Sequence, residues 1–444
     1  MDVLHLIHQF PPETRGGSEA YVEAVAARQR ARGVEAAVLA GSLEWRARVE
    51  IDPGEWNGIP VHRLHRDDFC LEHHAKNWHP VVGTAFADFL RRERPSLVHV
   101  HHWLRLTADL AAIAARLGVP SVVTLHDCWT SCPRIFRRRP GDPACSRELS
   151  PENCSGCVPR FGHERADEID EAISLHRDGF ASELSIARRV LVASPVTADL
   201  LSRTTGLSRD RYTVLPFGRD RRFKESRGPS EPADPLRFAY WGVVAPHKGI
   251  DVLLDAAGRL ASRFPGRFRL DVLGDFESEE CEKRVRAAAS GLPVAVHGPF
   301  DSADLLGAAP HCGVFPSVCF ETYGIAVDEC FELGLPCIVS DLGALPARAH
   351  GAGIVVPAGD AEALAAAMGS LIEDEGLRQR LSRSIPAPPP TLDEHVDRLE
   401  AIYREAVQAK EPFAEPISAD RRLALMLRQR ESALARIAPE GPRG

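Results

Sequence analysis

The chain has 444 residues, of which 44% are hydrophobic and 26% charged, and its formal net charge at pH 7 is −8. These proportions are those of soluble proteins, and a chain of this length is expected to form two domains, each with its own buried sheet. The negative charge argues against nucleic acid as a partner, because binding along a phosphate backbone requires a positive surface. No apolar run reaches the ~18 residues that a membrane-spanning helix needs.

The N-terminus and the cysteines predict a cytoplasmic protein. Residues 1–7 have no basic region ahead of their apolar run, so we expect no signal peptide. The eleven cysteines are odd in number and fall mostly in apolar runs, which suits reduced thiols better than a disulfide framework.

The N-terminal part of the chain alternates between short apolar runs, which suit buried strands, and longer stretches with helical periodicity. Such alternation is typical of a doubly wound parallel sheet in the α/β class. The residues from 41 to about 68 have a short alternating pattern that assigns no element. We predict strands at 3–8, 34–40, 97–102 and 121–125, and helices at 19–32, 81–92 and 107–117.

Candidate site residues lie where these predicted strands end, because ligands of doubly wound sheets bind beyond the carboxyl ends of the strands. Gly16 and Gly17 end the loop after the first strand and can offer backbone N–H groups to an anion, although a plain turn explains them equally well. Further along, the residues at two strand ends are His101 and His102, then His126 and Asp127. A structural role in hydrogen bonding competes with a catalytic role for these histidines.

Four cysteines crowd one loop of the first domain. Cys154 and Cys157 have the C-x2-C spacing of a metal knuckle, and Cys132 and Cys145 complete a set of four thiols. Four thiolates would hold a structural zinc ion with no open position for chemistry. Unligated thiols and a redox-dependent crosslink are the alternatives.

The remaining pattern completes the first domain and predicts a second. A polar, proline-bearing stretch at 224–235 predicts a connector. We place the domains at 1–217, with an insertion at about 128–160, and at 218–390, followed by a helical part at 391–444. The predicted strands are 189–193, 212–218, 236–242, 268–273, 294–300, 313–317, 337–341 and 353–356, and the predicted helices are 164–185, 196–203, one ending at 259, one from 324, 361–373, 392–409 and 419–437.

The last predicted helix is amphipathic and partly basic, which allows either internal packing or peripheral membrane contact. We predict packing, with the inner face of a membrane as the alternative location. The apolar residues concerned are Leu423, Leu425, Met426, Leu427 and Leu434.

Two glutamates lie in the predicted strand-loop-helix segment at 313–332. Glu321 lies on the loop, just before a helix whose free N–H groups can meet phosphate oxygens or sugar hydroxyls. Glu329 lies eight positions later, about two turns along that helix, so the two carboxylates can contact different parts of one ligand. Two solvated surface acids are the alternative interpretation.

Lys248 and Gly249 follow the predicted strand at 236–242, at the start of a helix. A lysine at such a junction can neutralise a diphosphate, and the glycine lets the backbone come close. In isolation, a surface lysine is the simpler explanation.

These motifs together resemble those of the retaining family-4 glycosyltransferases. The similarity is strongest at residues 314–368, and it includes the histidine-aspartate motif at 125–129 and the lysine-glycine motif at 248–249. It implies the GT-B fold, in which two Rossmann-like domains face a central cleft and the helix at 392–409 crosses back to the first domain.

The resemblance also implies roles for individual residues. Glu321 would contact hydroxyls of the donor sugar, His126 the transferred sugar, and Glu329 the ribose, whose vicinal hydroxyls suit a carboxylate. Lys248 would neutralise the diphosphate. The backbone of Thr322, Tyr323 and Gly324 would hold sugar and phosphate, and Gly16 and Gly17 would lie near the donor phosphates.

The implied activity is transfer of a sugar from a UDP- or GDP-sugar to a hydroxyl of a glycan, a lipid-linked acceptor or a small molecule, with retention and with no cofactor, as in polysaccharide biosynthesis. We expect a monomer or a homodimer. One departure concerns Val243, where many family members have an arginine, and Arg219 is the candidate that would replace this charge.

Two other functions stay open. A nucleotide-sugar epimerase would use the same architecture without an acceptor, and a catalytically silent protein would bind the sugar nucleotide or act as a scaffold. A nicotinamide-dependent oxidoreductase is disfavoured, because no G-x-G-x-x-G motif follows a strand with an acidic residue about 20 positions later.

Overall fold

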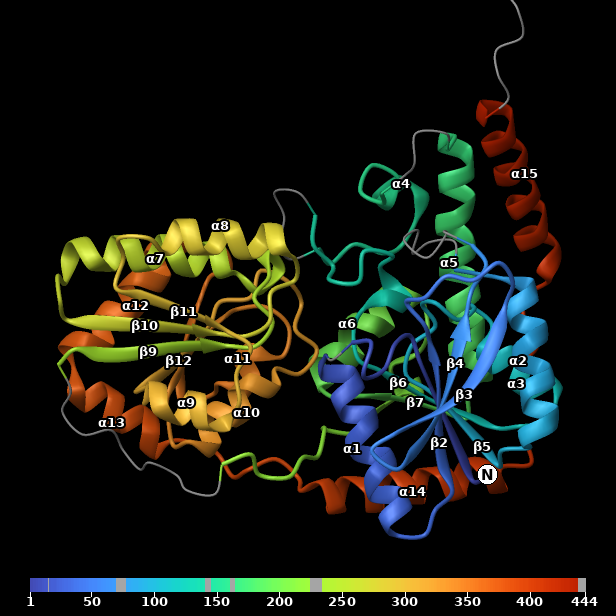
Figure 1. Ribbon diagram of the computed structural model, residues 1–444, viewed down its shortest axis with the longest axis horizontal. Coiled ribbons are helices and arrows are strands. Elements are labelled where there is room, and N and C mark those ends of the chain that lie inside the picture. Colours follow the sequence, from blue (N-terminus) through green and yellow to red (C-terminus); the bar gives the residue numbers. More distant parts are fainter. Residues whose placement is uncertain (15, 69–76, 140–144, 160–163, 224–233, 438–444) are drawn as a thin grey trace, which may run out of the picture. The chain divides into compact units, whose positions relative to one another are not determined.

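The computed structural model confirms the α/β class and divides the chain into two compact units (Figure 1). Unit 1 comprises residues 1–135, 146–218 and 392–444, and unit 2 comprises residues 136–145 and 219–391. The residues that the structure describes are 1–14, 16–68, 77–139, 145–159, 164–223 and 234–437. The predicted connector at 224–235 therefore lies outside the described residues except for its last two positions.

An eight-stranded sheet forms the centre of unit 1, in the order β3-β4-β2-β1-β5-β6-β7-β8. All neighbouring strands are parallel except β3 and β4, which are antiparallel. The strands are β1 (Val3–Ile7), β2 (Ala36–Gly41), β3 (Glu50–Trp56), β4 (Ile59–His65), β5 (Leu97–Val100), β6 (Ser121–Leu125), β7 (Arg189–Val192) and β8 (Tyr212–Val214).

The stretch that sequence patterns left unassigned is the hairpin of β3 and β4. Asn57 and Gly58 connect the two strands, and both have positive φ angles, of 50° and 77°. Asn-Gly is the preferred sequence of such a two-residue turn, because its twist matches that of the flanking strands. Pro53 and Gly54 inside β3 interrupt the strand pattern, which explains why the hairpin escaped prediction.

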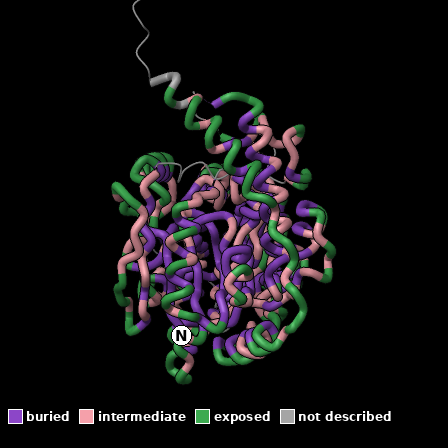
Figure 2. Tube along the Cα trace, turned by 90° about the vertical axis from the view of Figure 1, so that its right-hand side faces the viewer, coloured by how far each residue is buried: buried purple, intermediate pink, exposed green. Residues whose placement is uncertain are grey.

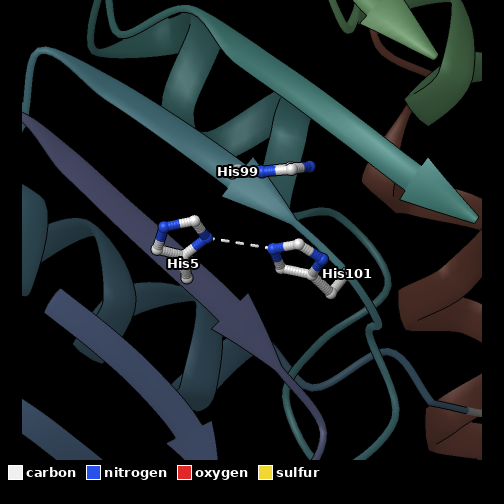
Figure 3. A group of neighbouring side chains, drawn as sticks. All are labelled: His5, His99 and His101. Atoms are coloured by element: carbon white, nitrogen blue, oxygen red, sulfur yellow. Dashed lines mark hydrogen bonds between the residues drawn. The ribbon is translucent and has the colours of Figure 1, made fainter. Parts of the chain in front are cut away.

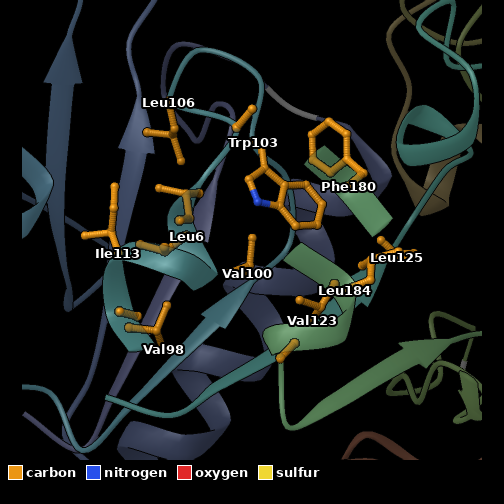
Figure 4. Close-up of a cluster of buried hydrophobic side chains, with 14 of the residues drawn as sticks. Leu6, Val98, Val100, Trp103, Leu106, Ile113, Val123, Leu125, Phe180 and Leu184 are labelled. Carbon is orange, nitrogen blue, oxygen red and sulfur yellow. The ribbon is translucent and has the colours of Figure 1, made fainter. Parts of the chain in front are cut away.

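Helices pack on the unit 1 sheet through an apolar core. Leu6, Val100 and Trp103 come from the sheet and its loops, and they meet Phe180 and Leu184 from α5 (Ala166–Ile186) (Figure 4). Buried residues follow the strands, and exposed residues lie on the outer surface (Figure 2). The helices are α1 (Gly17–Ala31), α2 (Pro80–Glu93), α3 (Leu110–Arg116), α4 (Pro151–Cys154), α5 (Ala166–Ile186), α6 (Pro195–Thr205), α14 (Leu392–Gln408) and α15 (Ala419–Ile437).

Helix α14 confirms the expected return of the chain to its N-terminal part. His395 on α14 shares a hydrogen bond of 2.8 Å with the hydroxyl of Tyr21 and one of 2.9 Å with the carbonyl of Pro216. Arg32 pairs with Asp397 at 2.7 Å on the same helix. These contacts hold α14 against α1 within unit 1.

Helix α15 packs on α5, but most of the residues predicted to form its packing face are not buried. Leu425 is buried in a cluster with Ile169 and Ile173. Leu423, Leu427 and Leu434 are exposed instead, because α5 covers only a narrow strip of α15. Within the part of the chain that the structure describes, no helix is long and apolar enough to cross a membrane.

Unit 2 contains a parallel six-stranded sheet in the order β11-β10-β9-β12-β13-β14. Four of its helices were not predicted, since they are short or strongly charged. The strands are β9 (Leu236–Trp241), β10 (Phe268–Leu273), β11 (Val294–Gly298), β12 (Cys312–Phe315), β13 (Cys337–Ser340) and β14 (Gly353–Val356). The helices are α7 (Ile250–Arg263), α8 (Glu279–Ala289), α9 (Ser302–Ala308), α10 (Ile325–Glu332), α11 (Leu345–Arg348), α12 (Ala361–Glu373) and α13 (Glu375–Arg383), of which α8, α9, α11 and α13 are the unpredicted ones.

Each sheet has one point where the order of the strands reverses. In unit 1 this point lies between β1 and β5, and in unit 2 it lies between β9 and β12. Connections leave on opposite sides of the sheet there and open a crevice beyond the carboxyl ends of the strands, where doubly wound proteins bind ligands.

Candidate active site

The strand reversal of unit 2 holds a lysine, a glutamate and a serine in one hydrogen-bonded group. Lys248 Nζ donates to Glu321 Oε1 over 2.7 Å, and Ser317 Oγ donates to the same oxygen over 2.6 Å. The side chains of Lys248 and Glu321 retain 29% and 16% of their accessible surface, so both are partly shielded yet reachable. Ser317 follows β12 and was not predicted.

Electrostatics keep this pair ionised. Burial alone would raise the pKa of Glu321, but the Lys248 ammonium and the hydrogen bonds from Lys248 and Ser317 lower it. Burial alone would lower the pKa of Lys248, but the Glu321 carboxylate raises it. Near neutral pH, therefore, a fixed positive and a fixed negative group stand side by side at the strand ends.

Gly249 lets Lys248 reach this position. The residue has a φ of 77° and connects the turn at Pro246–Lys248 to the start of α7. A Cβ atom there would overlap the carbonyl oxygen of Pro316, so the backbone passes β12 more closely than any other residue allows.

The predicted loop before α10 is confirmed. Glu321 precedes the helix, and Gly324 is its N-cap with a φ of 89°. Tyr323 is buried, and the guanidinium of Arg348 lies 4.2 Å from its ring centroid and pairs with Asp328 on α10. Thr322 lies between Glu321 and Tyr323, so the three residues predicted for sugar and phosphate form one segment at the start of α10.

Glu329 is held by neighbours that sequence analysis missed. Trp241 Nε1 donates to its Oε2 atom over 2.8 Å, and Arg222 Nη1 donates to its Oε1 atom over 3.0 Å. Arg219 lies 3.8 Å from Glu329 and donates a hydrogen bond to Glu332. The position of Trp241 at the end of β9 was a usable signal, whereas no local pattern marks Arg222.

A chain of histidines lies at the strand reversal of unit 1 (Figure 3). Gln29 on α1 and His5 on β1 are joined by a hydrogen bond of 2.8 Å. His5 and His101 are 3.0 Å apart at their ring nitrogens, and His101 and His126 are also 3.0 Å apart. The structure therefore connects the predicted His126 to a glutamine inside the fold.

The chain has one direction of donation. Gln29 Oε1 can only accept, so His5 donates from Nε2 and accepts at Nδ1. His101 must then donate from Nε2 to His5 and accept at Nδ1, which requires His126 to donate from Nε2. All three rings are neutral, because burial lowers the pKa of His5 and of His126 to about 4 and that of His101 well below its usual range. Gln29 thereby fixes the tautomer of His126.

His126 also has aromatic neighbours. The ring of Phe217 stacks on it with centroids 5.3 Å apart, and Tyr21 meets it edge-on at 5.1 Å. The adjacent Asp127 lies 3.3 Å from His102, which sequence analysis placed at the preceding strand end.

An acid that was not considered lies beside the predicted glycine loop. Gly16 is the N-cap of α1, and Gly17 is its first residue. The buried carboxylate of Glu19 lies against Gly16, where a Cβ atom would come 2.7 Å from its Oε2. Glu19 already places a negative charge at this helix N-terminus, the position that an anion would otherwise occupy.

Two family models match the chain, and together they extend over both units. "Glycosyltransferase Family 4" matches residues 15–223, and "Glycosyl transferases group 1" matches residues 235–374. The second match contains Lys248, Glu321 and Glu329. The chain belongs to the family-4 glycosyltransferases.

Relatives of this family-4 glycosyltransferase are similar along most of their length. The 2-deoxystreptamine N-acetyl-D-glucosaminyltransferase of Streptomyces fradiae is 28% identical, over 84% of this chain and 86% of the relative. The D-inositol 3-phosphate glycosyltransferase of Saccharomonospora viridis is 26% identical, over 91% of this chain and 93% of the relative.

Solved structures place the chain in the GT-B fold. HepE of Anabaena, in complex with UDP and glucose, has a TM-score of 0.59 and 18% identity, with coverage of 91% of this chain and 98% of HepE. The sucrose-phosphate synthase of Thermosynechococcus elongatus has a TM-score of 0.59 and 19% identity, over 98% and 100% of the two chains. At these identities the likeness concerns the fold alone.

The structure gives no support to zinc at the four cysteines of this glycosyltransferase. Among the described residues, two groups of three have metal-binding atoms within 4.8 Å of one another, and neither contains Cys132, Cys145, Cys154 or Cys157. One group is His5, His99 and His101, whose six ring nitrogens are all engaged in hydrogen bonds with protein groups. The other is Asp67, Asp68 and His79, where Arg66 and His79 already pair with the carboxylates.

The histidine chain predicts an acid-sensitive unit 1. His5 is fully buried, and its pKa falls from 6.5 to about 4 on folding, so the unfolded chain binds a proton that the folded chain does not. Stability from this residue is complete above pH 6.5 and is lost as the pH falls to 4, by roughly 3 kcal/mol at ~1.36 kcal/mol per pKa unit.

We expect His5→Gln to flatten the decline of the urea midpoint between pH 6.5 and pH 4, as measured by tryptophan fluorescence. The control is His297→Ala, which removes a histidine of unit 2 and should leave the slope of the unit 1 transition unchanged. An unaltered slope in folded His5→Gln would show that His5 titrates normally.

Proposed function

We propose that this protein transfers a sugar from a nucleoside diphosphate to an acceptor hydroxyl with retention at the anomeric carbon. The observation that carries the proposal is the charged group of Lys248, Glu321 and Ser317 at the strand reversal of unit 2. It offers a cation for the diphosphate and an oriented carboxylate for the sugar, as the family requires.

One carboxylate oxygen of Glu321 is available to the donor sugar. Its Oε1 accepts from Lys248 and Ser317, while its Oε2 makes no hydrogen bond to any described residue. A carboxylate held through one oxygen can accept from a sugar hydroxyl through the other without rearrangement. The Thr322 to Gly324 backbone and the N-terminus of α10 then face phosphate oxygens.

The charge missing at Val243 needs another source, and we assign it to Arg138. Arg219 is engaged by Glu329 and Glu332, so it is a poor replacement. The segment of Arg138 lies beside the site within unit 2, because Phe136 stacks on His247 at 4.1 Å and accepts a hydrogen bond of 3.3 Å from the backbone of Phe320. Arg138 makes no ion pair with a residue that the structure describes.

Charge near His247 agrees with this placement. Burial, the Lys248 ammonium and the Arg138 guanidinium together lower the pKa of His247 to about 4. Two cations thus act on the imidazole next to the Glu321 loop, and both can stabilise the negative charge that develops on a leaving diphosphate.

The proposed reaction is a displacement on one face of the sugar. The bond between the anomeric carbon and the diphosphate oxygen breaks, and the bond to the acceptor oxygen forms on the same face. The acceptor proton passes to an oxygen of the leaving phosphate, so this route assigns no step to a metal ion. Lys248 and Arg138 stabilise the leaving group, and His126 contacts the sugar by analogy with the family.

Relatives suggest the substrates to test first. HepE was solved with UDP and glucose, so a UDP-sugar is the first donor to test. The two curated relatives act, by their names, on 2-deoxystreptamine and on D-inositol 3-phosphate, both of which are polyhydroxylated six-membered carbocycles. We therefore propose a small cyclitol-like acceptor, in preference to a growing polysaccharide.

A donor panel tests this proposal. UDP-, GDP- and ADP-sugars are incubated without acceptor, and slow hydrolysis is expected for a UDP-sugar. Cyclitols are then added, and mass and NMR should show a glycoside of unchanged anomeric configuration. An inverted product contradicts retention, an isomerised free sugar without acceptor supports an epimerase, and binding without turnover supports a silent protein.

A further inference from the structure

Unit 1 contains a cavity that shares no residue with the proposed sugar-nucleotide site. Its volume is about 520 Å³, within the range of small-molecule sites. Helices α2, α3 and α5 line it together with the C-terminal segment 416–422. The cavity therefore forms when the C-terminal part of the chain packs on these helices.

A buried arginine lies in the wall of this cavity. Arg422 retains 9% of its accessible surface, yet it makes no hydrogen bond or ion pair with any residue that the structure describes. Burial lowers the pKa of this guanidinium, and the nearby carboxylates of Asp109 and Glu183 offset the effect of burial only in part. An arginine in such a place is explained if a ligand supplies an anion in direct contact with it.

Helix α5 makes room for this guanidinium. Gly179 lies in the middle of the helix, where glycine is less favourable than alanine. A Cβ atom at this position would overlap Nη2 of Arg422. Glycine therefore weakens α5 at the position where the Arg422 guanidinium packs against this helix.

The carboxylates near Arg422 are already engaged by other donors. Asp109 accepts hydrogen bonds from Trp78 Nε1 at 2.9 Å and from Thr107 Oγ1 at 2.7 Å. Glu183 accepts from the backbone N–H groups of two α3 residues and from Trp103 Nε1. Burial raises the pKa of Glu183 to about 7, so its negative charge is incomplete at neutral pH.

A second arginine strengthens the case for an anion. Arg116, exposed at the end of α3, lines the same cavity, and its positive charge contributes to the lowered pKa of Arg422. Within the described chain, Arg116 also has no ion-pair partner. Two like charges that repel each other across a cavity are both stabilised when an anion binds between them.

We propose that this cavity binds a small organic anion, with one carboxylate or phosphate on Arg422 and Arg116 and an apolar body against the remaining wall. The apolar part of the wall includes Pro80, Ala87, Ile113, Leu117 and Ile417. Trp78 offers a flat surface, with its ring centroid 6.0 Å from the Arg422 guanidinium. A lipid with a phosphate headgroup and a soluble metabolite both have this chemistry.

Octanoate, octyl phosphate, octanol and inorganic phosphate are the probes, and titration calorimetry on the full chain is the measurement. Both octyl anions should bind at millimolar concentration or tighter. Octanol lacks the charge and phosphate lacks the apolar body, so each should bind at least about tenfold more weakly. Equal binding of octanol and octanoate, or no binding of either octyl anion, would overturn the proposal.

Neighbouring arginines provide matched variants. Arg422→Gln should weaken octanoate at least about tenfold, since a charge-assisted pair is lost from a buried position. Arg421→Gln is the control, because Arg421 pairs with Glu171 and Asp178 instead of lining the cavity. Arg116→Gln, on the separate helix α3, covers the case in which Arg422→Gln fails to fold. The site is contradicted if Arg421→Gln and Arg422→Gln weaken octanoate binding equally. If Arg422→Gln does not fold, unchanged octanoate binding in Arg116→Gln contradicts it.

Vesicles distinguish the two sources of the anion. If the ligand is a lipid, the parental protein should float with vesicles of phosphatidylcholine and phosphatidic acid in a density gradient. The fraction of protein that floats should be at least about threefold lower for Arg422→Gln than for Arg421→Gln. If only octyl phosphate and octanoate bind, the ligand is a soluble metabolite. Either result supports an anion site. The proposal is overturned if neither octyl anion binds and the parental protein and Arg422→Gln float with the vesicles equally.

Discussion

Replacing Lys248 by alanine should lower turnover about 10²- to 10³-fold, the loss typical when one fixed donor to developing negative charge is removed. The reason is its place at the strand reversal of unit 2, where it donates to Glu321 at 2.7 Å. The diphosphate is charged before and after the reaction, so nucleotide affinity should fall as well. Lys283→Ala is the control, because that exposed lysine on α8 lies 4.0 Å from the carboxylate of Glu279.

The same variant should alter the pH profile. In the parental protein Lys248 lowers the pKa of Glu321, and without it burial raises this pKa. The acidic limb of activity should therefore move to higher pH in Lys248→Ala but not in Lys283→Ala. Parental turnover and an unmoved acidic limb in folded Lys248→Ala would refute the role of this pair.

Two further arginine variants locate the second cation. Arg138→Ala should lower turnover about tenfold, since an exposed charge contributes less than a shielded one. Arg219→Ala should act mainly through its contacts with Glu329 and Glu332. A larger loss in diphosphate affinity for Arg219→Ala than for Arg138→Ala would contradict the assignment to Arg138.

Replacing His126 by alanine should lower turnover about 10²-fold while nucleotide affinity stays within about threefold. The proposed contact of His126 is with the sugar, where charge redistributes as the glycosidic bond breaks. Lys248→Ala and His126→Ala should therefore differ, the first losing affinity and turnover together and the second losing turnover. Initial rates and calorimetry with UDP measure the two quantities.

The histidine chain provides an independent readout for the same residue. Nitrogen NMR on the parental protein should show His126 protonated at Nε2, as the hydrogen bonds to His101, His5 and Gln29 require. Gln29→Leu removes the terminal acceptor, so the His126 tautomers should mix and turnover should fall while UDP affinity is retained. Parental nitrogen shifts of His126 in this variant would show that Gln29 does not set the tautomer.

Local sequence was sufficient for much of the fold. The alternation of apolar runs with helical periods predicted most strands of both sheets, because buried parallel strands have continuous apolar side chains. Gly324 marked the start of α10, and the motif of Glu321 and Glu329 identified the family from residues that lie within a few turns of one another. The hairpin at Asn57 and Gly58 was not predicted, because Pro53 and Gly54 interrupt the pattern of its first strand.

Tertiary structure decided which of these residues meet. Gln29, His5, His101 and His126 are separated by 24, 96 and 25 positions along the hydrogen-bonded chain, so no local pattern links them. Their contact depends on strand order, which places β1 beside β5 and β5 beside β6. Trp241, the last residue of β9, meets Glu329 for a similar reason, because β9 lies beside β12, the strand that precedes α10. Arg222 meets Glu329 from a segment outside both sheets.

The C-terminal helix shows the limit of the sequence most clearly. Its amphipathic pattern determined that α15 forms a helix, but the pattern could not determine how much of its apolar face finds a partner. Packing on α5 buries Leu425 and leaves Leu423 and Leu427 exposed. It also brings Arg422 to Gly179, 243 positions earlier, and so creates a cavity from helices that have no sequence pattern in common. Periodicity fixes the face that a helix offers, whereas the shape of the neighbouring surface decides which residues on it are covered.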